Sequence, residues 1–123
     1  MTSTNRSDIN RFLVLAKRAL LADGLWIVQR DKNRAFLRER AITRAQQEDA
    51  ILALTASDYS KGPELDDRGR PGEVWIFGPV YEGCQLYIKL KLVVDGPAQH
   101  LLCLSFHDAE RELKRPHVGG EDL

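Results

Sequence analysis

The chain has 123 residues, 43% of them hydrophobic and 29% charged, and its 18 basic residues balance 18 acidic ones. This composition is that of one globular domain, and zero net charge argues mildly against a nucleic-acid-binding protein because Lys and Arg make most phosphate contacts. No apolar run approaches the roughly 20 residues that cross a membrane, and residues 1–6 lack the plan of a signal peptide, so we expect a cytoplasmic protein without a membrane partner.

The first predicted element is a helix over residues 8–23. Apolar residues recur there at helical spacing. Ser7 or Asp8 is a suitable N-cap, and Gly24 lies where a helix would end. The β-favouring run at 26–28 then predicts a short edge strand.

Basic residues dominate the next segment, 30–44, in which a short basic helix is predicted over 33–40. The charges there form either a basic patch or a solvated helix face. Thr43 is an N-cap with Gln46 in the capping-box position, so a further helix is predicted to begin there and to end near residues 55–57. Residues 64–72 predict a flexible loop, in which Leu65 is the one core-forming residue.

Three consecutive antiparallel strands are predicted over residues 73–107. In 85–94 the apolar residues alternate with Tyr87, Lys89 and Lys91, so one sheet face is a core face and the other carries these polar side chains. Asp95-Gly96-Pro97 provides a turn. We expect the loop to close around Pro97, with Tyr87 opposite His107 and both side chains on the polar face.

These elements predict an α+β fold in which the helices pack on one sheet face and leave the other open for function. We expect a single domain over 1–123, with 1–6 and 109–123 flexible. The chain has no CxxC or HExxH motif and only three scattered histidines, so no metal or cofactor is expected. Cys84 and Cys103 are expected to be reduced, with Cys103 in the core.

The polar sheet face carries the residues that suggest chemistry. Cleaving RNA without a metal requires a base for the 2′-hydroxyl, an acid for the leaving oxygen and cations for the phosphorane charge. His107, Tyr87 and Lys61 offer these groups, and Lys89 and Lys91 share the face of Tyr87. The alternative is a polar face that is merely solvated.

Four motifs in order resemble the MqsR-type toxins of bacterial type II toxin–antitoxin systems. They are ILALTASDYSK at 51–61, Val74-Trp75, QLYIKL at 85–90 and LSFH at 104–107. The order and approximate spacing of the family's motifs match over residues 42–107, and the N-terminal helix fits the family's layout more loosely.

This resemblance implies a RelE-like fold, a small antiparallel sheet with N-terminal helices packed on one face. It also implies an mRNA endoribonuclease that inhibits translation and growth until a cognate antitoxin binds it, an antitoxin that carries a zinc-binding segment and a helix-turn-helix. Position by position, Lys61 and Tyr87 match the family's active-site lysine and tyrosine. His107 lies where the family has a lysine, which completes the expected catalytic set of Lys61, Tyr87 and His107.

The sequence departs from the family pattern at Ile76, where the family has a polar glutamine after the strand tryptophan. Lys89 and Lys91 are expected to bind substrate, and Arg68 and Arg70 of the loop could reach RNA, although a disordered loop without that role is the alternative. Trp75 and Phe77 are expected in the core rather than stacked on bases. The alternative function is a non-catalytic RNA- or protein-binding module on the same fold.

Overall fold

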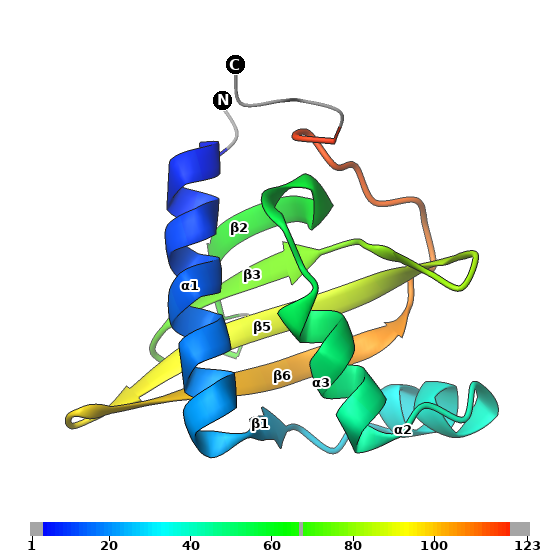
Figure 1. Cartoon of the computed structure of the whole chain (residues 1–123), viewed down its shortest axis with the longest axis horizontal. Coiled ribbons are helices and arrows are strands. Elements are labelled where there is room, and N and C mark those ends of the chain that lie inside the picture. The colour runs from blue at the N-terminus through cyan, green and yellow to red at the C-terminus, as the bar shows by residue number, and fades with distance from the viewer. Residues whose placement is uncertain (1–3, 67, 119–123) are drawn as a thin grey trace.

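A computed structural model describes residues 4–66 and 68–118 of the chain (Figure 1). Its elements in chain order are α1 (Arg6–Asp23), β1 (Leu25–Ile27), α2 (Asp31–Glu39), α3 (Arg44–Leu52), the 3₁₀ turn η1 (Ala56–Asp58), β2 (Tyr59–Leu65), β3 (Glu73–Phe77), β4 (Val80–Tyr81), β5 (Cys84–Asp95) and β6 (Ala98–Asp108). This confirms the α+β class. No helix of the described part is long and apolar enough to span a bilayer.

The helix α1 carries the predicted apolar stripe on its buried side. Ile9, Phe12, Leu13, Ala16, Ala19 and Leu20 are all buried. The helix begins two residues earlier than predicted because the side chain of Asn5, not Ser7 or Asp8, caps it by accepting a hydrogen bond from the Asp8 N–H. It ends where Gly24 adopts a positive φ of 79°.

The helices α2 and α3 confirm the two remaining helical predictions, with shifted ends. Thr43 caps α3 in the predicted capping box with Gln46. Figure 1 shows α1 and α3 in front of the sheet and α2 beyond its β1–β6 edge. The helix α2 thus lies at the edge of the sheet beside β6, with Phe36 buried in the same core as α1.

The sheet has the strand order β1-β6-β5-β3-β2, with β4 paired to β5. It is mixed, which corrects the predicted antiparallel sheet: β1 runs parallel to β6, with Leu25 opposite Leu101, and every other pairing is antiparallel. The physical reason is that β1 satisfies backbone groups on the free edge of β6 while it buries Leu25 in the core.

A strand that the sequence did not predict, β2, forms the other edge. Tyr59 pairs with Phe77 and is buried, while Leu65 is 85% exposed instead of contributing to the core. Gly62-Pro63 is a typical loop signal, but proline is compatible with an edge strand at a bulge, and here it lies in the register irregularity between Lys61 and Glu64.

The β5–β6 hairpin has the predicted register at Tyr87 and His107, but near the turn the register differs by one residue. Asp95 pairs with Ala98 around the Gly96-Pro97 turn, and Tyr87 lies opposite His107. The register shifts after Lys89, so that Leu104 is an extra residue on β6. The register of the turn alone would place Tyr87 opposite Phe106, so the extra residue at Leu104 is what brings His107 opposite Tyr87.

Aromatic residues fill the core between α1 and the sheet. The ring of Phe12 stacks on Trp75 with centroids 4.6 Å apart and lies 6.1 Å from Phe77, which confirms both strand aromatics as core residues. Cys103 is buried beside them, and burial raises the pKa of its thiol to about 12. Side chains alternate along a strand, so Ile76 of β3 and its partner Lys89 of β5 face away from α1, because Trp75 and Phe77 face it.

Asn33 of α2 joins the helix to the sheet edge. It is 2% exposed; its Nδ2 donates to the Leu104 carbonyl at 3.1 Å, and its Oδ1 accepts from the Phe106 N–H at 3.0 Å. The side chain thus replaces a neighbouring strand where β1 has ended. This contact holds α2 beside β6.

Candidate functional site

Tyr87 and His107 form a pair on the sheet face opposite α1. Their ring centroids are 5.3 Å apart and the rings are nearly parallel, at 8°. The pairing follows from the β5–β6 register, in which the two residues are directly opposite. His107 is 8% exposed, so the sheet and its surroundings hold the imidazole in a defined position.

The pair lies in a cavity of about 490 Å³. The described residues that line it are Arg30, Lys32, Tyr87, Lys89, Ser105, His107, Glu110, Arg111 and Leu113. One wall comes from the start of α2 and another from the segment after β6. Neither wall is part of the strands that carry the predicted catalytic residues.

The imidazole of His107 has one nitrogen engaged. Its Nδ1 lies 2.8 Å from the backbone carbonyl of Asp108, and a carbonyl can only accept, so Nδ1 carries the hydrogen. Nε2 is then the nitrogen that remains for proton transfer to or from a substrate. This backbone contact therefore fixes the orientation of the imidazole ring.

The cavity is rich in positive charge. Arg30, Lys32, Lys89 and Arg111 contribute four cationic side chains against the carboxylate of Glu110. Lys32 Nζ lies 2.7 Å from Glu110 Oε2, and the pKa of Glu110 is lowered mainly by this hydrogen bond and charge. The surplus of cations favours an anionic ligand such as a phosphodiester.

The segment after β6 is held in place by the side chain of Gln85. Its Nε2 donates to the carbonyls of Gly78 and Leu113, each at 3.1 Å, and its Oε1 accepts from the Leu113 N–H at 2.9 Å. Glu110, Arg111 and Leu113 of this segment therefore form a wall of the cavity. The rest of the segment for which flexibility is expected, 119–123, lies outside the described residues, as do 1–3.

Lys61 is not among the residues that line the cavity. It pairs with Ile76, which pairs in turn with Lys89, so Lys61 and Lys89 are two strands apart, about 10 Å at the backbone. The Lys61 ammonium is exposed and lies 3.8 Å from Glu64. The structure thus brings Tyr87 and His107 together without Lys61, whose catalytic role stays a prediction.

Lys91 is buried, in contrast to its expected contact with RNA. It is 4% exposed, and its Nζ lies 2.7 Å from Asp66 Oδ2. A Cβ on Gly72, whose φ is 100°, would come within 2.7 Å of the lysine Cε, so the glycine lets the β2–β3 connection close over Lys91. This burial counts against Lys91 as a substrate-binding residue.

Arg68 and Arg70 are exposed in that same β2–β3 connection. The Arg68 N–H donates to Asp66 Oδ1 at 2.8 Å, so the connection is organised around the carboxylate that binds Lys91. Neither arginine lines the cavity of Tyr87 and His107. Their contact with RNA stays a prediction.

The Lys91–Asp66 pair predicts a stability change in acid. The pKa of Asp66 is lowered from 3.8 to about 2, first by the hydrogen bond from Lys91 and then by that from the Arg68 N–H. A lowered pKa means that the stabilisation is present above pH 3.8 and is lost as the pH falls toward 2. We expect thermal melting temperatures measured between pH 5 and pH 2 to fall more steeply for the wild type than for Asp66→Asn.

The exposed Asp31→Asn variant is the matched control, since Asp31 has only a 3.9 Å contact with Arg34. Its melting curve should fall in acid as steeply as that of the wild type. Equal slopes for the wild type and Asp66→Asn would show that the buried pair makes no pH-dependent contribution.

Sequence reasoning missed Arg30, Lys32, Glu110 and Arg111. The basic run at 30–44 was visible, but nothing local showed that α2 would lie beside β6. Ile76, which stands where the family has glutamine, is 1% exposed and offers no polar group to the site.

No cluster of three His, Cys, Asp or Glu side chains able to hold a metal ion occurs within residues 4–66 and 68–118. Comparison with protein-family models finds no matching family, and comparisons with curated proteins and with solved structures find no similar chain.

Proposed function

We propose that this chain is a metal-independent mRNA endoribonuclease with a RelE-like fold, the toxin of a type II toxin–antitoxin system. The observation that carries the proposal is the Tyr87–His107 pair, which lies in a cavity with four cationic side chains. An acid–base pair and phosphate-binding cations are what RNA cleavage requires. The resemblance of the sequence motifs to MqsR-type toxins supports the same function.

In the proposed reaction, His107 Nε2 removes the proton from a ribose 2′-hydroxyl. The 2′-oxygen attacks the adjacent phosphorus, the P–O5′ bond breaks, and the Tyr87 hydroxyl supplies a proton to the leaving 5′-oxygen. The products are a 2′,3′-cyclic phosphate and a 5′-hydroxyl, and the histidine proton returns to tyrosinate directly or through water. Lys89, Arg30 and Arg111 stabilise the charge on the phosphorane.

The proposal places the protein in the cytoplasm, where an antitoxin covers the site until it is released. Zero net charge is compatible with this function because the cations are concentrated in one cavity. The proposed antitoxin carries a zinc-binding segment and a helix-turn-helix, as the sequence resemblance implies.

The test is induction of the wild type, Tyr87→Phe and His107→Ala in a bacterial host without the antitoxin, with growth and transcript integrity followed together. We expect the wild type to arrest growth with cleaved mRNA and both variants to relieve the arrest. A folded wild type that binds RNA but leaves growth and transcripts intact would instead support the non-catalytic binding module, for which the apolar Ile76 is the structural argument.

A further inference from the structure

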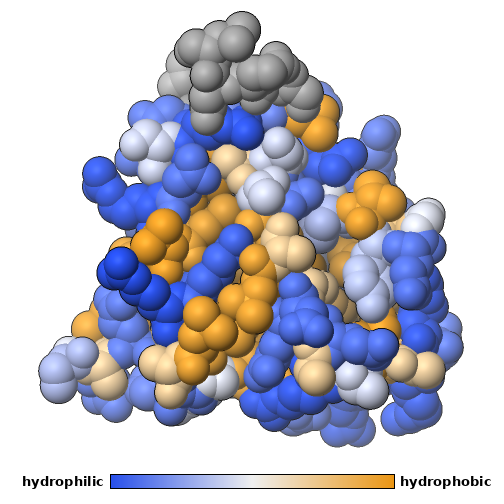
Figure 2. All heavy atoms as spheres, in the orientation of Figure 1, coloured by the Kyte–Doolittle hydropathy of each residue, from blue (hydrophilic) through white to orange (hydrophobic). Residues whose placement is uncertain are grey.

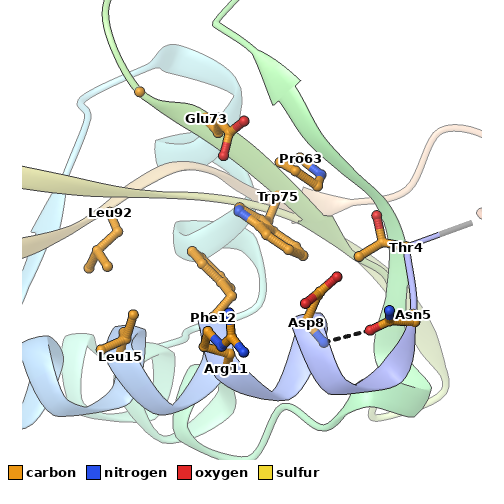
Figure 3. Close-up of a pocket in the computed structure, with 11 residues that line it drawn as sticks. Thr4, Asn5, Asp8, Arg11, Phe12, Leu15, Pro63, Glu73, Trp75 and Leu92 are labelled. Carbon is orange, nitrogen blue, oxygen red and sulfur yellow. Dashed lines mark hydrogen bonds between the residues drawn. The ribbon is translucent and has the colours of Figure 1, made fainter.

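A second cavity, of about 900 Å³, lies on the other side of the sheet from Tyr87 and His107 (Figure 3). It opens between the first half of α1 and the ends of β2, β3 and β5. Its described lining residues are Thr4, Asn5, Asp8, Arg11, Phe12, Leu15, Pro63, Gly72, Glu73, Trp75 and Leu92. The proposed nuclease site uses none of them.

The floor of this cavity is apolar. Figure 3 shows Phe12 of α1 and Trp75 of β3 side by side at its centre, with Leu15 and Leu92 toward one end. Figure 2 shows apolar side chains gathered on the face of the molecule that carries α1. Such a floor favours aliphatic or aromatic groups on the ligand.

The rim of the cavity carries charged side chains that no other described residue neutralises. Asp8 from α1 and Glu73 from β3 point toward the cavity (Figure 3), and Arg11 lies nearby. Within the described residues, these three side chains make no ion pair and no hydrogen bond to another side chain. By contrast, Thr4 donates to the Gly62 carbonyl and Asn5 caps α1, so their side chains are already used.

We propose that this cavity binds a peptide segment of a protein partner in which a Lys or Arg lies next to an apolar residue. The apolar side chain packs on Phe12 and Trp75, and the basic side chain pairs with Asp8 and Glu73. Arg11 donates to the carbonyls of the peptide backbone, which distinguishes a peptide from a simple apolar ligand. A volume of about 900 Å³ accommodates a few side chains.

This inference does not depend on the proposed ribonuclease activity. Trp75 and Phe77 face α1, while Tyr87 and Lys89 alternate onto the opposite face, so the two cavities are separated by the sheet. A peptide in the second cavity therefore leaves the Tyr87–His107 face accessible. The two proposals are tested with variants on opposite faces of the sheet, so the failure of one can be distinguished from the failure of the other.

The test uses a displayed library of random 12-residue peptides, selected on the full chain. We expect enriched sequences to share a Lys or Arg within two residues of a large apolar residue. A synthetic peptide of the enriched sequence should change Trp75 emission in a Trp26→Phe background, in which Trp75 is the only tryptophan.

The double variant Asp8→Asn, Glu73→Gln should weaken binding of that peptide at least about tenfold. The exposed acids of α2 provide the matched control, because Asp31→Asn with Glu39→Gln makes the same change in net charge and should leave the affinity unchanged. Circular dichroism confirms that both double variants are folded.

Three results would overturn the proposal: no enriched peptide, enriched peptides without basic residues, or equal affinity for the wild type and the Asp8/Glu73 variant. Sedimentation provides the remaining check. Self-association of the wild type that is lost in the Asp8/Glu73 variant would identify a second copy of the chain, rather than a partner, as the occupant.

Discussion

Replacement of His107 by alanine is expected to lower the rate of RNA cleavage by the purified chain about 10²–10⁴-fold, the usual contribution of a positioned general base. The imidazole is held by its Nδ1 contact with the Asp108 carbonyl and by stacking on Tyr87, so the variant removes the base without breaking a strand. The measurement is single-turnover cleavage of a labelled RNA in the presence of a chelator, with the 2′,3′-cyclic phosphate quantified.

His100→Ala is the matched control, because His100 lies on the same strand but contacts Asp23 and Trp26 at the far end of β6. Its cleavage rate should match that of the wild type if its fold is retained. If His107→Ala cleaved RNA at the wild-type rate, His107 would not be the general base. If the wild type and His107→Ala bound RNA equally well and neither cleaved it, the chain would not be a ribonuclease.

Replacement of Asn33 by alanine is expected to lower the free energy of unfolding by about 2–6 kcal/mol. The variant leaves the Leu104 carbonyl and the Phe106 N–H of β6 without their partner in a buried position, at a cost of about 1–3 kcal/mol for each group. Urea denaturation followed by circular dichroism measures the difference.

Asn10→Ala is the control, since Asn10 is exposed on α1 and its replacement should change stability by no more than about 0.5 kcal/mol. Because Asn33 adjoins Lys32, the Asn33 variant should also weaken RNA binding, whereas the Asn10 variant should not. Equal stability of the two variants would show that the edge of β6 is satisfied without Asn33.

The elements predicted correctly are those whose signals are local. The apolar stripe of α1 and the capping box of Thr43 and Gln46 each lie within a few residues of the structure they specify. The pairing of Tyr87 with His107 was also predicted correctly, but the turn at Gly96-Pro97 does not produce it alone: continued without a shift, the register of the turn would place Tyr87 opposite Phe106, and the extra residue Leu104 brings His107 there instead.

The environment of that pair was not predictable. Arg30 and Lys32 reach the cavity because Asn33 binds the edge of β6, and Arg111 reaches it because Gln85 holds the segment after β6. Each contact joins residues far apart in the chain. A run of basic residues or a polar tail has the same sequence pattern whether it is exposed to solvent or lines a cavity, so the sequence could not distinguish the two.

The alternating pattern of β5 likewise placed Lys89 and Lys91 on one face but could not distinguish them. Lys89 lines the cavity of Tyr87 and His107. Lys91 is buried against Asp66, which belongs to the segment predicted to be a flexible loop. The sequence by itself therefore determined the α+β class, the main helices and the polar face that carries Tyr87 and Lys89, because these depend on short-range periodicity and capping. The exact pairing of Tyr87 with His107 depends in addition on the extra residue Leu104 in β6. Only the tertiary structure decided the parallel β1, the edge strand β2 and which charges surround the pair, because those depend on which strand edges and buried polar groups remain to be satisfied.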